Sequence, residues 1–184
     1  MTPAPVRFTT TAIFLHWFAA VLIFAAFPLG LYMSGLTLSP TMLKLFSYHK
    51  WLGVTVFVLT VARLVWRAGH AAPALPEAIP AWQRRASAGV HHLLYLLLFA
   101  VPLTGWLMSS AKGFQTVYLG VLPIPDVLPK DKALGEQLAA VHEVLSWAMM
   151  LLLVPHIGAA LKHHFVTRND VLIRMVPWLA KVRR

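Results

Sequence analysis

Four long stretches with almost no charged residues constrain the fold of this chain more than any other feature. They run over about residues 12–33, 45–66, 87–109 and 138–161. A helix needs about 20 mostly apolar residues to cross the hydrocarbon core of a membrane, and each stretch meets that length. Backbone polar groups find no water in that core, so such segments cross it as helices. The sequence therefore predicts an all-α integral membrane protein built as a bundle of four transmembrane helices.

The composition excludes most classes of soluble enzyme and several kinds of redox site. Hydrophobic residues make up 59% of the 184 positions and charged residues only 12%, which is about half the charged share of a soluble domain. The chain has no cysteine, which excludes disulfides, iron–sulfur clusters, thiol catalysis and covalently attached c-type haem. Without repeats, the chain is predicted to form one membrane domain over residues 1–184.

Prolines mark the predicted loops between the helices. Residues 68–82 and residues 112–137 contain three prolines each, and residues 34–44 contain Gly35 and Pro40. Proline lacks the backbone N–H that continues a helix, so these segments are predicted to connect the spans. A basic tail is predicted over residues 162–184.

Lysine and arginine are concentrated at one end of the predicted helices. With a cytoplasmic N-terminus, the inner set is Arg7, Arg63, Arg67, Arg84, Arg85, Lys162, Arg168, Arg174, Lys181, Arg183 and Arg184, and the outer set is Lys44, Lys50, Lys112, Lys130 and Lys132. Because cytoplasmic loops carry the excess of basic residues, both termini are predicted to face the cytoplasm. Of the net charge of +10, the inner side then carries about +9 and faces anionic lipid, so no nucleic-acid partner is expected.

Four histidines inside the predicted spans lie at two matched depths. His16 and His156 lie four and five residues from the cytoplasmic ends of their helices, and His49 and His142 lie four residues from outer ends. Ionisable residues inside membrane spans are costly and commonly mark functional sites. The depths therefore predict an inner pair, His16 with His156, and an outer pair, His49 with His142.

The spacing within the fourth helix indicates what these pairs hold. His142 and His156 are 14 residues apart, which is about 40° short of four full turns and a rise of about 21 Å, so both project from nearly one face. Two imidazoles on one iron are typical of haem that transfers electrons. Zinc or manganese sites favour carboxylates beside imidazole, and the spans contain only Glu143. Two haem groups are therefore predicted, with the four histidines as ligands of the haem iron.

Other histidines leave alternatives open. His91 and His92 lie near the inner level, so either could replace His16 as a ligand, and His91 is also a candidate contact to the side of the haem. His163 follows His156 by two helical turns and is a candidate quinone contact, or else an ordinary interfacial histidine.

Nine short segments of the sequence are similar to the bacterial di-haem cytochrome b561 family, and in particular to its membrane superoxide oxidase type. They are residues 14–17 (FLHW), 48–53 (YHKWLG), 91–95 (HHLLY), 101–105 (VPLTG), 141–143 (VHE), 155–156 (PH), 162–165 (KHHF), 169–170 (ND) and 174–177 (RMVP). The fourteen-residue histidine pair is the most specific of these matches. The adjacent His91 and His92 depart from the family pattern, in which one of these histidines is displaced along the helix.

This resemblance implies a protein of the bacterial inner membrane that contains two haem b groups. It implies the same four ligands, with His16 and His156 on the inner haem and His49 and His142 on the outer one. It further implies that superoxide is oxidised at the periplasmic side and that ubiquinone accepts the electrons. The partners expected are membrane lipid, quinone, and superoxide or a redox donor protein. The outer lysines are candidates for attracting the superoxide anion.

Two alternatives have different functions. The chain could be the haem-carrying membrane subunit of a dehydrogenase or hydrogenase complex, because such subunits have a similar histidine layout. It could also be a non-redox, histidine-rich membrane protein. A quinone-reducing oxidoreductase is the leading hypothesis, and an electron carrier without an activity of its own is the nearest alternative.

Overall fold

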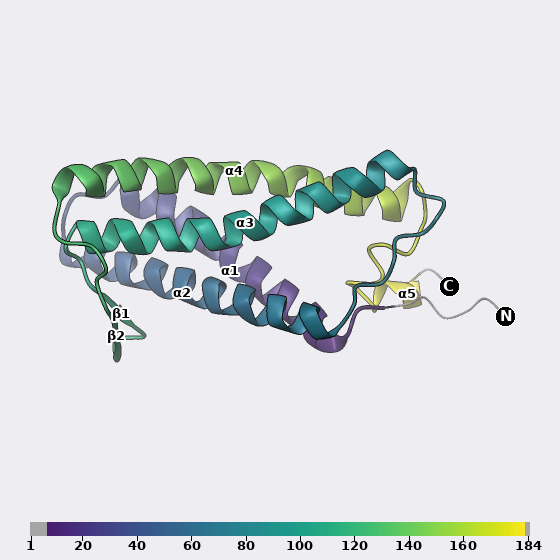
Figure 1. Cartoon of the computed structure of the whole chain (residues 1–184), viewed down its shortest axis with the longest axis horizontal. Helices are drawn as coiled ribbons and strands as arrows, with labels where there is room; N and C mark the ends of the chain where they lie inside the picture. The colour runs from purple at the N-terminus through teal and green to yellow at the C-terminus, as the bar shows by residue number, and fades with distance from the viewer. Residues whose placement is uncertain (1–6, 183–184) are drawn as a thin grey trace.

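A computed structural model describes residues 7–182 and shows four long helices within them. They are α1 (Thr10–Ser34), α2 (Pro40–Gly69), α3 (Ala81–Ala111) and α4 (Lys132–Phe165). All four run along the long axis of the molecule (Figure 1). Each is long and apolar enough to cross a membrane. The predicted four-helix membrane bundle is confirmed.

Each long helix extends beyond its predicted bounds at both ends. Three of them begin directly after an N-cap residue, which is Thr9, Ser39 or Asp131. The side-chain oxygen of each N-cap accepts a hydrogen bond from the backbone N–H three residues further along the chain. Such N-caps satisfy donors that have no partner inside the helix. The added turns carry charged and polar residues, so the helices continue past the apolar stretches from which their bounds were predicted.

The C-terminal segment folds back onto the end of the bundle where α1 begins. Because α4 continues to Phe165, the first residues of the predicted tail belong to this helix. The segment ends in a short helix, α5 (Leu179–Val182). Trp17 Nε1 donates to the carbonyl of Met175 at 2.9 Å, which joins the segment to α1. Arg183 and Arg184, part of the predicted inner set, lie outside the described residues.

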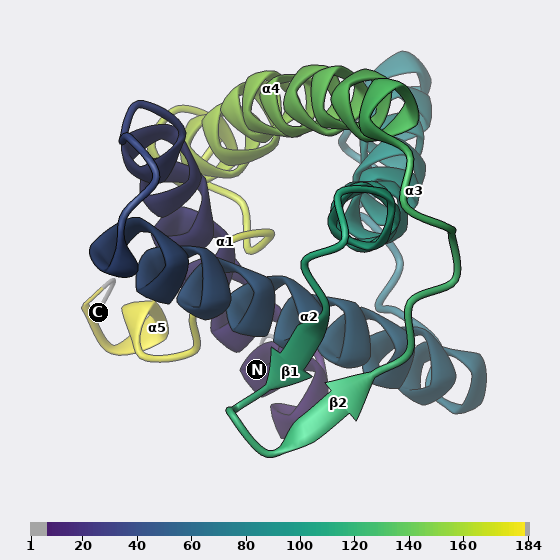
Figure 2. The same cartoon turned by 90° about the vertical axis from the view of Figure 1, so that its left-hand side faces the viewer.

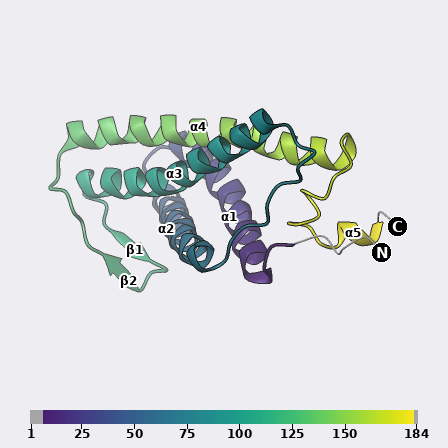
Figure 3. The same ribbon diagram turned by 45° about the vertical axis from the view of Figure 1, so that its right-hand side comes forward.

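The helices pack against one another in chain order. α1 packs on α2, α2 on α3, and α3 on α4. Viewed from its hairpin end, the molecule shows the four helices arranged around a central space (Figure 2). In an oblique view, α3 and α4 lie on one side and α1 and α2 on the other (Figure 3).

An apolar core joins all four helices at mid-height. Its buried members are Ile23, Val56, Leu94, Leu98 and Met149. Met149 lies seven residues from both His142 and His156, so the core separates the two predicted histidine levels. Large apolar side chains also point outward, and Leu151 and Val154 are each 68% exposed. An outer surface of this kind is stable in lipid rather than in water.

A β-hairpin that the sequence analysis does not predict lies between α3 and α4. Its strands are β1 (Thr116–Tyr118) and β2 (Leu122–Ile124), which pair antiparallel. Leu119 and Gly120 both have positive φ, at 53° and 75°. Positive φ at both central residues is typical of the tight turns that join two antiparallel strands. The hairpin lies against α2 at the end opposite α5 (Figures 1 and 2).

Candidate functional site

The outer histidines face each other across the bundle. His49 comes from α2 and His142 from α4, and their ring centroids are 6.1 Å apart, with the ring planes at 83°. A metal–imidazole bond is about 2 Å long, so two rings on opposite sides of one metal ion have centres about 6 Å apart. The pair therefore has the separation that a shared haem iron requires.

Both outer rings are oriented by backbone carbonyls of neighbouring helices. His49 Nδ1 lies 3.1 Å from the carbonyl oxygen of Ala26, and His142 Nδ1 lies 2.9 Å from that of Val101. A carbonyl can only accept, so Nδ1 of each ring carries the proton and donates it. Nε2 then keeps its lone pair for a metal, which is the arrangement found around most metal-binding histidines.

Two glycines allow the rings to reach these carbonyls. Gly30 and Gly105 each stand four residues after the accepting carbonyl, one turn along α1 and α3. A Cβ built on Gly30 would lie 3.0 Å from Cε1 of His49, and one on Gly105 would lie 3.1 Å from Cε1 of His142. Any larger residue would push the imidazole away from its acceptor. Gly53 of α2, by contrast, has open space at its Cβ position.

We expect Gly105→Ala to weaken haem binding at the outer level. The new methyl group must displace His142 by a few tenths of an ångström and strain its bond to Val101. Losing an orienting contact of this type lowers metal affinity about tenfold to a hundredfold. Haem content per purified chain measures the effect. Gly158→Ala in α4 is the matched control, because its Cβ would meet nothing within 4 Å. Equal loss in both variants would contradict the orienting role.

A cavity of about 560 Å³ opens beside the outer pair. Its walls come from all four helices and the hairpin and are mainly apolar, with Phe27, Phe57, Trp106 and Trp147 among the aromatic residues. Cofactor sites in proteins are of this size and apolar character, with a few polar groups that fix orientation. The imidazoles of His49 and His142 are such groups. The residues here fit a flat, largely apolar macrocycle with two axial imidazoles.

The hairpin closes the outer end of this cavity against α2. Trp51 Nε1 donates to the carbonyl of Val117 at 2.7 Å, and the hydroxyls of Thr55 and Tyr118 are 2.9 Å apart. Lys50 Nζ donates to the carbonyl of Phe114 at 2.6 Å. The ammonium of Lys50 is thus engaged by the hairpin, and is not the free surface cation that its sequence position suggested.

The inner histidines also face each other. His16 of α1 and His156 of α4 have ring centroids 6.2 Å apart and planes at 59°. Among the described residues, the buried Nδ1 of His16 has no hydrogen-bond partner. The separation matches that of the outer pair, so the structure brings together both pairs that the depths predicted. Within residues 7–182, no group of three or more His, Asp or Glu side chains is placed so that it could hold a metal ion by itself.

The structure distinguishes His91 from its neighbour His92. His91 is half-buried, and its ring centroid lies 5.2 Å from that of His156, nearly perpendicular. Its Nδ1 lies 2.7 Å from the carbonyl oxygen of Ser87 in the preceding turn. His92 is exposed. Adjacent helical residues point about 100° apart, so only one of them can face the site.

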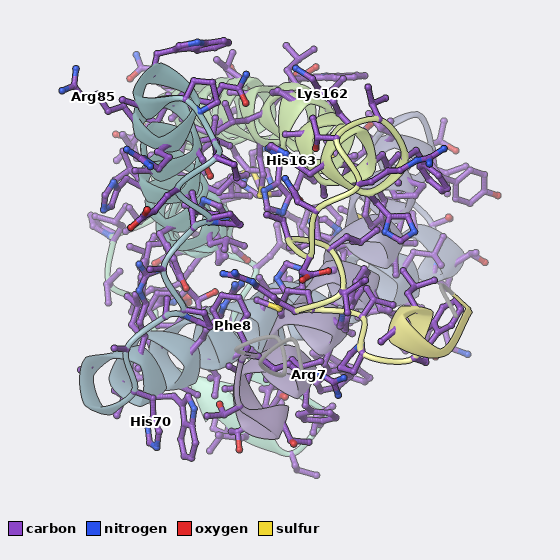
Figure 4. All side chains as sticks on the ribbon, turned by 90° about the vertical axis from the view of Figure 1, so that its right-hand side faces the viewer. Arg7, Phe8, His70, Arg85, Lys162 and His163 are labelled. Atoms are coloured by element: carbon purple, nitrogen blue, oxygen red, sulfur yellow. The ribbon has the colours of Figure 1, made fainter. Side chains whose placement is uncertain are left out.

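His163 lies at the inner end of the bundle with a defined tautomer. Asn169 Oδ1 accepts from the backbone N–H of Val171 at 3.2 Å, so its amide nitrogen faces His163 Nδ1, at 2.9 Å. Nδ1 therefore accepts, and in the neutral ring Nε2 carries the proton. Figure 4 shows this end of the molecule, where Arg85 extends outward and His70 lies at the periphery. His70 stacks on Trp66 with centroids 4.0 Å apart.

Comparison with known proteins identifies the family of this arrangement. The sequence model described as "Prokaryotic cytochrome b561" matches residues 7–178. "Cytochrome b561 homolog 2" of Escherichia coli (strain K12) is 34% identical over 177 residues, covering 95% of this chain and 94% of that protein. "Cytochrome b561 homolog 1" of the same organism is 33% identical over 175 residues, covering 93% and 97%. "Probable superoxide oxidase CybB" of Yersinia pestis is 27% identical over 139 residues, covering 71% and 78%.

The family consists of membrane electron-transfer proteins that bind b-type haem, in agreement with four spans and facing imidazoles. The match covers nearly the whole chain, including the three helices that carry the paired histidines. The chain therefore belongs to the prokaryotic cytochrome b561 family.

Proposed function

We propose that this chain holds two haem b groups, with His16 and His156 on the inner iron and His49 and His142 on the outer one. One observation carries the proposal: two imidazole pairs face each other at 6.2 and 6.1 Å on two levels of the same bundle. Both levels share α4, where 14 residues correspond to a rise of about 21 Å. Bound haem iron would supply one-electron transfer at each level.

His16 is the better partner for His156 than His91 is. The ring centroid of His91 lies 5.2 Å from that of His156, which is closer than two rings on opposite sides of one iron. The His16 ring centroid lies 6.2 Å from that of His156, which is the separation expected for opposite sides of one iron. We assign His91 to the side of the inner haem, where it packs against the ligand His156.

The proposed reaction joins superoxide to ubiquinone. Two superoxide anions at the outer, periplasmic side each lose one electron and become O₂. Ubiquinone takes the two electrons together with two protons and becomes ubiquinol. The similarity to a protein named as a superoxide oxidase supports this choice of donor. Lysines at the outer end, such as Lys44 and Lys112, would favour approach of the anion.

The inner end is the proposed side of quinone reduction, in a bacterial inner membrane with both termini in the cytoplasm. His163 fits a quinone contact because its Nε2–H can donate a hydrogen bond to a quinone carbonyl. The position, two turns beyond His156 on α4, brings this donor to the membrane interface, where a lipid-soluble substrate can arrive.

We expect His163→Phe to raise the KM for ubiquinone while leaving both haem spectra unchanged. Phenylalanine keeps a flat ring but removes the donor, and one lost neutral hydrogen bond corresponds to roughly a fivefold to tenfold change. His163→Gln keeps an N–H donor and should recover part of the affinity. Steady-state quinone reduction measures both variants. An unchanged KM in His163→Phe would exclude this contact.

The direct test of the proposed reaction uses the purified chain without any soluble partner. Superoxide generated in solution should reduce the haem absorption bands, and added ubiquinone should reoxidise them with formation of ubiquinol. If superoxide leaves the haems oxidised and only a dehydrogenase partner reduces them, the chain is instead the membrane subunit of a larger complex.

A further inference from the structure

Arg63 places a positive charge inside the membrane-spanning part of α2, at the level of the inner histidines. The residue is half-buried, six positions before the helix ends at Gly69. Its guanidinium lies over the ring of Tyr95, one turn after His91 on α3. From this position its charge reaches His16 of α1, His91 of α3 and His156 of α4. Arg63 therefore faces the interior at the point where the three inner histidines meet.

Within residues 7–182, no carboxylate balances this charge. Helices α1, α2 and α3 contain no aspartate or glutamate. Among the described residues, no acidic side chain acts on the charge of Arg63. The guanidinium lies 5.3 Å from the ring centroid of Tyr95 on α3, and that of Arg67 lies 5.8 Å from the same ring. Two positively charged guanidinium groups thus lie over the same aromatic ring.

A desolvated cation without a counter-charge is costly, particularly within a membrane. A cation–π contact compensates only in part, because it is weak compared with the cost of removing a charge from water. The arrangement is consistent with a site whose anion arrives with a ligand. Arg67 is exposed and one turn nearer the helix end, so water and lipid headgroups can solvate it. Arg63, which is more buried, is the residue that needs an anion from the interior.

We infer that Arg63 binds a propionate carboxylate of the inner haem. The inference rests on the proposed di-haem function, because the anion is part of that group. Haem b carries two propionates, and the planar fork of a guanidinium matches a carboxylate through two parallel hydrogen bonds. The fixed positive charge then stabilises the reduced form of the inner haem, since reduction removes one positive charge from the iron.

The test compares Arg63→Gln, Arg63→Lys and Arg67→Gln in the haem-loaded protein by redox titration and by redox-difference infrared spectroscopy. In Arg63→Gln, we expect a lower midpoint potential for the inner haem, shifted propionate carboxylate bands and an unchanged outer haem. Arg63→Lys should restore most of the potential, because it keeps the charge. Arg67→Gln should change both readouts less. Loss of the inner haem alone in Arg63→Gln, with recovery in Arg63→Lys, also supports the inference.

An inner potential and carboxylate bands that do not change in Arg63→Gln would overturn the inference while leaving the di-haem proposal intact. A shift that appears only in anionic lipid would assign Arg63 to a headgroup phosphate and overturn it as well. Loss of both haems in Arg63→Gln and Arg63→Lys alike would show a purely structural role. If the unaltered chain binds no haem at the inner level, the proposed function itself has failed.

Discussion

The His142→Ala variant should retain one haem and lose the other. His142 is one of the two facing imidazoles at the outer level, and its Nδ1 donates to the carbonyl of Val101, which would leave Nε2 to bind an iron. Alanine removes that ligand and enlarges the cavity beside it, while the inner pair lies about 21 Å further along α4. Haem content per chain should fall to about half, with one of two b-type absorption bands missing.

Two variants serve as controls for this result. His156→Ala should remove the other haem, so the two spectra should be complementary. His70→Ala should keep both haems, because His70 is exposed and stacks on Trp66 at the end of α2. If His142→Ala and His156→Ala remove the same band, or neither changes haem content, the pairing is wrong.

The His156→Ala variant should separate superoxide oxidation from quinone reduction. Its outer haem, held by His49 and His142, should still be reduced by superoxide. Ubiquinol formation should fall to the background rate, because no redox centre remains between the outer level and the inner end. Rapid mixing with superoxide measures the first step, and steady-state ubiquinol formation measures the second.

His16→Ala should behave in the same way as His156→Ala, since both residues are assigned to one iron. His91→Ala tests the competing assignment. A variant of His91 that loses the inner haem, together with a His16 variant that keeps it, would show that His91 is the second ligand. Full ubiquinol formation in His156→Ala would exclude transfer through the inner level.

The sequence predicts the parts of this fold that depend on hydrophobic length and helical period. Four apolar stretches indicate four spans, and their number, order and long-axis arrangement follow from the membrane alone. The histidine pairs come from the same regularity, because matched depth on helices that face each other across one bundle brings His16 near His156 and His49 near His142.

The details that escape prediction depend on contacts between distant segments. Strands β1 and β2 have three residues each within a proline-containing link, too short for an alternating pattern. The one available signal in the sequence was the pair Leu119 and Gly120, which lies between the β-branched residues Val117 and Val121. The hydrogen bond from Lys50 to the carbonyl of Phe114 joins residues that are 64 positions apart. It could not be predicted without knowing that the hairpin lies against α2.

The sequence also could not decide which of His91 and His92 faces the inner histidine pair. The two residues have nearly the same depth and differ only in direction around α3, by about 100°. Their directions depend on how α3 rotates against α4, which packing decides. The sequence predicted Arg63 three residues from the inner end of its span, whereas the structure extends α2 to Gly69, six residues beyond Arg63, and leaves the residue half-buried.

The central claim is that one chain holds two haem b groups on two imidazole pairs. Haem quantification of the purified protein, combined with a redox titration of its absorption bands, tests it most directly. The account predicts two haems per chain that titrate as two separate one-electron steps. A single haem per chain, or two that are both lost in His142→Ala, would contradict it.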